Sequence, residues 1–294
     1  LWYETPHAIV FVVGWTKEKR EGYLNSLVEA LETTYKRLWH RGYRGRFIVF
    51  RWDTRKYLMG MGLKQSEYRA FKYGAELKEY VDTLPESYAT HVMGHSQGGV
   101  LLLEALKLGM VADTALFLQS VVPTEALDPD RDLDYPGSEG ILTPDTAEEF
   151  GYRGYLTETK TPVYSFFNQE DIAFLGWNNV QRGRKPVKNM TRWYRYYPDR
   201  EPGDQVYLGY YWFWERPVTD PHEAMAFVSR PRTYAIGSEP RARGVVQESF
   251  DLNGTGLEFG AEHGAQFSWN IQRTTTFYNL LLDVFNVAHN PVEP

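Results

Sequence analysis

The sequence of 294 residues contains no cysteine. Without thiols the chain can form no disulfide, no thiolate metal site and no cysteine nucleophile. It also lacks an apolar run approaching the roughly 20 residues that span a bilayer. The longest run, Ala8–Gly14, has the length of a strand. These absences exclude several protein classes but leave the redox compartment open, because a thiol-free chain suits either environment.

An excess of positive charge is also missing. Against 38 acidic residues stand 32 basic ones, a net charge of −6, so no global field attracts nucleic acid or anionic lipid. No phosphate-binding loop, dinucleotide-binding glycine pattern or HExxH zinc motif is present, so we expect no metal and no cofactor. The first residue is Leu1, so we expect a processed or trimmed N-terminus, as in secreted or periplasmic proteins. Neither compartment nor oligomeric state follows from the sequence.

The 43% of hydrophobic residues can build a sizeable core. In the first half, short apolar runs typical of buried strands alternate with segments that have apolar residues at helical spacing. This alternation predicts an α/β fold, a mostly parallel open sheet with helices on both faces. The expected strands are His7–Val13, Arg46–Trp52, Thr90–Met93, Ala115–Val122, Val163–Phe167, Arg232–Ile236 and Val245–Leu252. The expected helices are Lys19–His40, Glu67–Leu84, Val100–Leu108, Asp220–Ser229 and Trp269–Val287.

Aromatic residues are concentrated between Ile172 and Trp214, where they occupy 12 of 43 positions. We expect one domain over residues 1–294, with an aromatic-rich insertion at 172–240 after the fifth strand. Such an insertion would emerge at the carboxyl edge of the sheet, where open α/β folds bind ligands. One hypothesis is that it caps a site and that Trp177 and Trp212 bind substrate. The alternative is that its rings only pack against one another.

The motif Gly94–Gly99, GHSQGG, lies between the third expected strand and the helix that begins near Val100. It matches G-x-S-x-G in the required context of strand, sharp turn and helix. A serine on such a turn exposes its hydroxyl above the sheet edge, while the glycines allow strand and helix to approach closely. The helix N-terminus also directs free N–H groups to where an oxyanion would form. The pattern predicts that Ser96 is a nucleophile; the alternative is a glycine-rich turn with an incidental serine.

With this motif the sequence resembles the α/β-hydrolase superfamily, and in particular its bacterial lipases and esterases. The resemblance covers most of residues 7–171 by element order. It implies a catalytic triad in the chain order Ser, Asp or Glu, His, acyl-ester chemistry and no cofactor. Two departures are visible: Val13 stands where the family often has His, and the family's first two antiparallel strands have no room before His7.

A serine hydroxyl becomes a good nucleophile only when a base takes its proton, so a histidine is required. Of the seven histidines, His222 and His263 follow the serine and precede the C-terminal tail. His263 lies in a loop just before the last expected helix, where the resemblance places the base. We therefore favour His263 over His222 as the base.

The acid should follow the strand Val163–Phe167, at the carboxyl edge of the sheet. Asp171 and Glu170 both fit this position. We favour Asp171 because aspartate is the commoner third member of such triads. Glu262, beside the base, is a weaker candidate, and a solvated acidic turn is the structural alternative.

An oxyanion hole is built from backbone N–H groups. Gln97 follows the nucleophile and would supply one donor. The other is expected in the loop after the first strand, from Trp15, whose indole could also bind substrate as one wall of the acyl pocket. The alternative for Trp15 is plain packing against the sheet edge.

Two further patterns favour solvated loops. The acidic residues of Asp128–Glu139 fall at calcium-loop spacing, but Leu133 replaces the required glycine and Pro136 stiffens the loop. The basic run Arg182–Lys185 lies near tyrosines, a pattern that can bind single-stranded nucleic acid. Because the protein is acidic, we expect no nucleic-acid partner.

The sequence therefore predicts a serine hydrolase that cleaves carboxylic esters, small or polymeric, through an acyl-enzyme. The alternatives are a thioesterase, amidase or acyltransferase with the same triad. A non-catalytic hydrolase-fold module that binds a glycan or polymer through the aromatic insertion is the alternative outside catalysis.

Overall fold

The computed structural model describes residues 6–14, 21–53, 69–70, 72–122, 124–127, 156, 158–169, 171, 194–195, 206–209, 215–218, 235–238, 244–252, 263, 267 and 271–289. Its main feature is a six-stranded sheet in the order β2-β1-β3-β4-β5-β9, in which all neighbouring strands are parallel. The strands are β1 His7–Val12, β2 Arg46–Phe50, β3 Ala89–His95, β4 Thr114–Leu118, β5 Val163–Phe167 and β9 Val246–Asp251. The predicted α/β class is confirmed.

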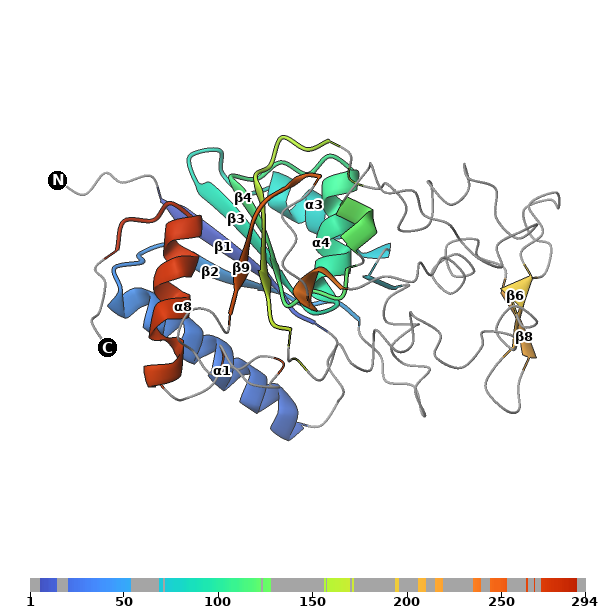
Figure 1. Ribbon diagram of the computed structural model, residues 1–294, viewed down its shortest axis with the longest axis horizontal. Coiled ribbons are helices and arrows are strands. Elements are labelled where there is room, and N and C mark those ends of the chain that lie inside the picture. The colour runs from blue at the N-terminus through green and yellow to red at the C-terminus, as the bar shows by residue number, and fades with distance from the viewer. Residues whose placement is uncertain are drawn as a thin grey trace.

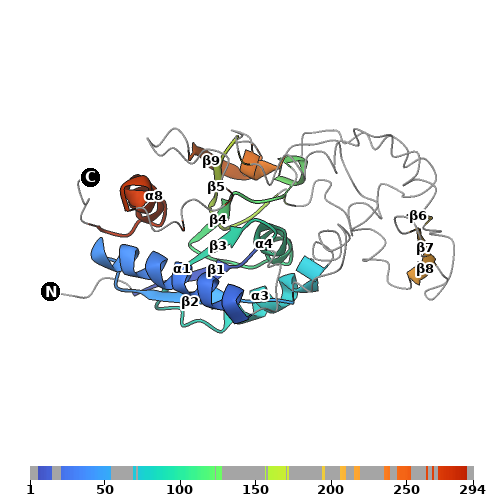
Figure 2. The same ribbon diagram turned by 90° about the horizontal axis from the view of Figure 1, so that it is seen from below.

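Helices cover both faces of this sheet (Figures 1 and 2). On one face lie α1 Glu21–His40 and α8 Ile271–Val284, and on the other α3 Gly74–Asp82 and α4 Gly98–Lys107. Phe277 of α8 and Phe285, which directly follows the helix, are buried, and their rings pack on Phe166 of β5 and His91 of β3, respectively. The apolar faces of the helices and the buried central strands thus form one continuous core.

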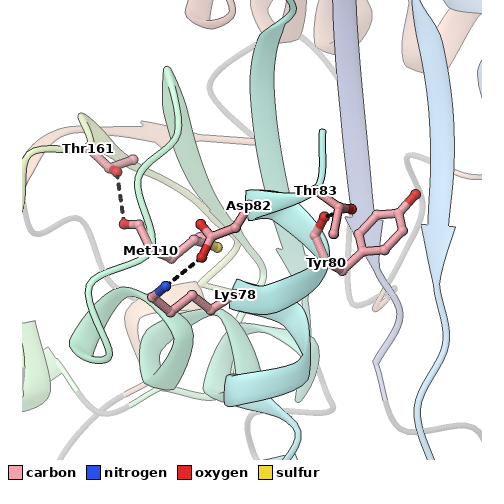
Figure 3. A network of polar contacts seen from close by, with 6 residues as sticks. All are labelled: Lys78, Tyr80, Asp82, Thr83, Met110 and Thr161. Atoms are coloured by element: carbon pink, nitrogen blue, oxygen red, sulfur yellow. Dashed lines mark hydrogen bonds and ion pairs between the residues drawn. The ribbon is translucent and has the colours of Figure 1, made fainter. Parts of the chain in front are cut away.

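The helix α3 ends through local polar contacts, which Figure 3 shows. Thr83 donates both its hydroxyl, at 2.6 Å, and its backbone N–H to the Tyr80 carbonyl in the last turn of the helix. Lys78 and Asp82, four residues apart on the exposed side, form an ion pair at 2.5 Å. Behind the helix, Thr161 hydrogen-bonds the Met110 carbonyl and ties the start of β5 to the loop after α4.

Two expected strands differ from the structure. The strand predicted over Ala115–Val122 ends at Leu118, because Gln119 has a positive φ of 41° that a strand cannot continue. Of the strand predicted over Arg232–Ile236, the described part is a single bridge at Ala235 followed by a 3₁₀ turn, Ile236–Ser238. Apolar composition alone did not distinguish a buried turn from a strand. The helix predicted over Asp220–Ser229 lies outside the described residues.

A second sheet falls within the segment 172–240 that we expected to be an insertion. Its strands β6 Tyr194–Arg195, β7 Val206–Gly209 and β8 Glu215–Val218 are antiparallel neighbours in this order. They form a sheet separate from the large one (Figure 1).

Candidate active site

The candidate site lies at the carboxyl edge of the large sheet, where the strand order reverses. From β1 the chain first adds β2 on one side and then crosses to β3 on the other. In open α/β sheets this reversal opens a crevice for ligands. Gly14 follows β1 at this point, and a Cβ there would lie 2.7 Å from the Cβ of Ser96. The loop after β1 therefore passes directly beside the candidate nucleophile.

Ser96 occupies a strained turn between β3 and α4. Its φ is +53°, in the left-handed region that residues other than glycine rarely adopt. The conformation is held by the backbone, since the Ser96 N–H donates to Leu118 and its carbonyl accepts from Val121. Such an outlier is what a nucleophile elbow requires, and strain of this kind is concentrated at functional sites.

The glycines of the motif make this turn possible. A Cβ on Gly94 would lie 2.8 Å from the carbonyl oxygen of Gly98, so strand and helix touch there. A Cβ on Gly98 would collide with the Val12 carbonyl of the neighbouring strand. The close approach expected from the glycine spacing is therefore present. Gln97, between Ser96 and Gly98, is buried.

The structure brings the predicted base and acid together. Nδ1 of His263 lies 2.5 Å from Oδ2 of Asp171, although 92 residues separate them in the chain. A carboxylate can only accept, so Nδ1 carries the proton and Nε2 is left as the basic nitrogen. The Asp171 side chain is fully buried, whereas that of His263 is 20% exposed. This arrangement fixes the tautomer and the orientation of an imidazole at the sheet edge.

His95 connects this pair to the elbow. Its ring lies 4.9 Å from that of His263, between centroids, and also packs on Phe11 and edge-on against Phe267. His263 therefore adjoins the residue next to Ser96. Burial, and secondarily the neighbouring His263, hold the pKa of His95 well below its usual value. A neutral His95 adds no positive charge that would oppose a protonated His263.

Gln119, which directly follows β4, is a site residue that no sequence pattern indicated. Its side-chain amide donates a hydrogen bond of 2.8 Å to Oδ2 of Asp171, the oxygen that also accepts from His263. The available signal was its position after an apolar strand, at the edge where the site was expected. The residue type itself indicates no role in a triad.

Several predicted residues lie outside the described residues. They are the oxyanion candidate Trp15, the substrate-binding candidates Trp177 and Trp212, the rivals Glu170, His222 and Glu262, and the acidic loop Asp128–Glu139. Among the residues that are described, no group of three or more His, Cys, Asp or Glu could hold a metal ion. In the same part of the chain, no helix is long and apolar enough to cross a membrane.

The parallel order β2-β1-β3-β4-β5-β9, with a strained serine after the central strand β3 and a histidine–carboxylate pair at the same edge, is an α/β-hydrolase fold. No protein-family model matches the sequence, and no curated protein matches it. Similarities to solved structures are distant.

Among these structures is YbtT, the type II thioesterase of the yersiniabactin pathway, which is 13% identical with a TM-score of 0.32 over 65% of this chain and 94% of the other. Tomato methylketone synthase I with 2-tridecanone is 11% identical with a TM-score of 0.40 and covers 97% and 99% of the two chains. Est1E from Butyrivibrio proteoclasticus is 15% identical with a TM-score of 0.32 and covers 60% and 74%. The fold assignment therefore depends on the sheet order and the elbow.

Proposed function

We propose that this protein is a serine hydrolase that cleaves carboxylic esters with Ser96, His263 and Asp171. The observation that carries the proposal is the Asp171–His263 hydrogen bond at the edge where Ser96 adopts its strained turn. A histidine that donates Nδ1–H to a buried carboxylate has the tautomer of a general base. The alternative, an incidental serine in a glycine-rich turn, does not explain why His263 and Asp171 are hydrogen-bonded at this edge.

In the proposed mechanism Ser96 Oγ attacks the ester carbonyl while Nε2 of His263 takes the hydroxyl proton. Asp171 stabilises the imidazolium and holds its orientation. The tetrahedral intermediate expels the alcohol, which receives the proton from Nε2, and Ser96 is left acylated. A water molecule, deprotonated by the same nitrogen, then attacks the acyl carbon, and Nε2 returns the proton to Ser96 Oγ as the acid is released.

The oxyanion would be stabilised by the backbone N–H groups of Gln97 and Trp15. Gln97 is the residue after the nucleophile, the usual position of one donor. Support for Trp15 comes from Gly14, the residue before it, whose backbone lies against Ser96. Each such donor is typically worth about 3 kcal/mol of transition-state stabilisation.

The test is labelling with a fluorophosphonate, which phosphonylates an activated serine, together with hydrolysis of p-nitrophenyl esters. The wild-type protein should be labelled and Ser96→Ala should not, with kcat lower by about 10⁶-fold. Ser165→Ala removes another buried hydroxyl, on β5, and should still be labelled. A folded wild-type protein that is neither labelled nor active would overturn the proposal and favour a binding module. Labelling that survives Ser96→Ala would place the nucleophile elsewhere.

For the substrate we propose that the segment 172–240 caps the site and that Trp177 and Trp212 contact the acyl group. The support is the aromatic density of this segment and its position directly after Asp171. An ester series of increasing acyl length, with thioesters and amides of the same acyl groups, separates ester cleavage from the related chemistries. Replacing residues 172–234 by a short linker, which keeps Ala235 and the buried turn Ile236–Ser238 in place, should flatten the chain-length preference. An unchanged preference would remove the cap from the proposal.

A further inference from the structure

Gln119 is a buried glutamine whose side chain ends at the candidate acid. Its Nε2 lies 2.8 Å from Oδ2 of Asp171, and the same oxygen accepts from Nδ1 of His263 at 2.5 Å. The two donors come from distant parts of the chain, Gln119 just after β4 and His263 after β9. One carboxylate oxygen thus receives two hydrogen bonds, and each restricts rotation of the Asp171 carboxylate.

The backbone of Gln119 is unfavourable for a glutamine. Its φ of +41° lies in the left-handed region, where glycine and asparagine are better tolerated. Its N–H donates to the Phe166 carbonyl of β5 at 2.8 Å, which fixes this conformation. Glycine would relieve the strain but has no side chain, and asparagine is one methylene shorter. The position therefore combines a strained backbone with a side chain long enough to reach Asp171, a combination typical of functional sites.

We propose that Gln119 is a positioning residue of the triad, which holds the Asp171 carboxylate so that His263 presents Nε2 to Ser96. This inference rests on the proposed function. Gln119 touches neither the substrate nor the reacting atoms and acts only through Asp171. Its amide N–H also balances part of the negative charge on Oδ2 of Asp171.

The kinetic test uses Gln119→Leu and Gln119→Gly, both of which remove the donor. Because the base is less well oriented, kcat should fall by up to about 100-fold in both variants. KM should change little, since no substrate contact is lost.

Stability measurements separate this role from a structural one. Gln119→Gly relieves the left-handed strain, so it should stay folded even if Gln119→Leu does not. The matched control is Asn286→Gly, which makes the same backbone change at φ +50° just after α8. It should leave kcat unchanged. A folded Gln119→Gly with wild-type kcat would overturn the proposal.

A readout that needs no catalysis is the NMR resonance of the His263 Nδ1 proton, assigned by its loss in His263→Gln. In Gln119→Leu and Gln119→Gly this resonance should shift, because its acceptor loses a second donor. If it shifts while the wild-type protein hydrolyses no ester, the proposed function fails and the action of Gln119 on the Asp171–His263 pair stands. If it does not shift in either variant, the positioning role is wrong whether or not esters are cleaved.

Discussion

Strand β3 carries two histidines on the same face of the sheet, and each has a second histidine beside it. Near the amino end, His91 hydrogen-bonds His7 ring to ring, at 3.0 Å between Nε2 and Nδ1. At the carboxyl end, the ring of His95 lies beside that of His263. The two pairs differ in the group to which a histidine is hydrogen-bonded. His91 bonds to another imidazole, whereas His263 bonds to the carboxylate of Asp171.

This difference shows that residue type alone does not make a base. Burial, with a smaller effect of the neighbouring His7, lowers the pKa of His91 to about 3. A histidine in that environment stays neutral and does not hold the proton that a general base must accept. The carboxylate of Asp171 would stabilise that proton on His263. The sheet thus presents one histidine pair suited to packing and another suited to proton transfer.

The largest effect is expected from Asp171→Asn, which removes the charge of the carboxylate that binds His263. An amide cannot stabilise the imidazolium, and it can turn its N–H₂ toward Nδ1 and favour the wrong tautomer. We expect kcat for ester hydrolysis to fall by about 10⁴-fold, the loss typical of this change in Ser-His-Asp triads. Steady-state kinetics would measure it, with circular dichroism as the check on folding. A decrease of less than tenfold in a folded variant would remove Asp171 from the triad.

A medium effect is expected from the first pair, as a change in the pH dependence of stability. Between pH 6.5 and about 3, His91 binds a proton in the unfolded chain but not in the folded one. Its contribution to the free energy of unfolding is therefore complete above pH 6.5 and is lost on acidification, by about 1.4 kcal/mol per pH unit. In His91→Gln this loss should be absent from urea denaturation curves at pH 6, 5 and 4.

Curves at pH 8 provide the control, because His91 is neutral there in both states and any difference between wild type and variant reports packing alone. If the variant lost stability on acidification as steeply as the wild type, burial of a neutral His91 would not be the cause.

The smallest effect is expected from a third pair, His289 and Asp283, which joins a histidine to a carboxylate far from any strained serine. Nε2 of His289 lies 2.8 Å from Oδ1 of Asp283, whose side chain is 65% exposed. Asp283→Asn should change the free energy of unfolding by at most about 1 kcal/mol, because solvent screens the pair. Ester hydrolysis should be unaffected. A tenfold lower kcat would mean that a histidine–carboxylate pair matters for activity wherever it lies.

Local patterns were sufficient to predict most of the fold. The bounds of β5 agree with its predicted range, and β1 ends one residue before its predicted end. Such short apolar runs are readily recognised as buried strands in the sequence. The strand expected to continue through Val122 ends at Leu118 instead, since the hydrogen bond that the Gln119 N–H donates to Phe166 of β5 holds Gln119 in a turn. Such a tertiary effect leaves no mark on the sequence around it.

A site residue is easier to predict from the sequence when its role depends on its immediate neighbours in the chain. Ser96 was recognisable because its turn needs glycines at fixed spacing. Asp171 and His263 could be proposed only from their order in the chain, and the structure pairs them. Gln119 was out of reach, because its contact with Asp171 spans 52 residues and glutamine is common at strand ends for many reasons.

Main-chain hydrogen bonds hold this edge of the sheet in register. The amide of Ser96 is bound by Leu118, its carbonyl by Val121, and the amide of Gln119 by Phe166. These hydrogen bonds join three adjacent strands, β3, β4 and β5, at their carboxyl ends. A shift of Ser96 would therefore also displace Gln119, whose side chain binds the Asp171 carboxylate. Changes in the surrounding loops would then leave the positions of Ser96 and Gln119 relative to each other unchanged.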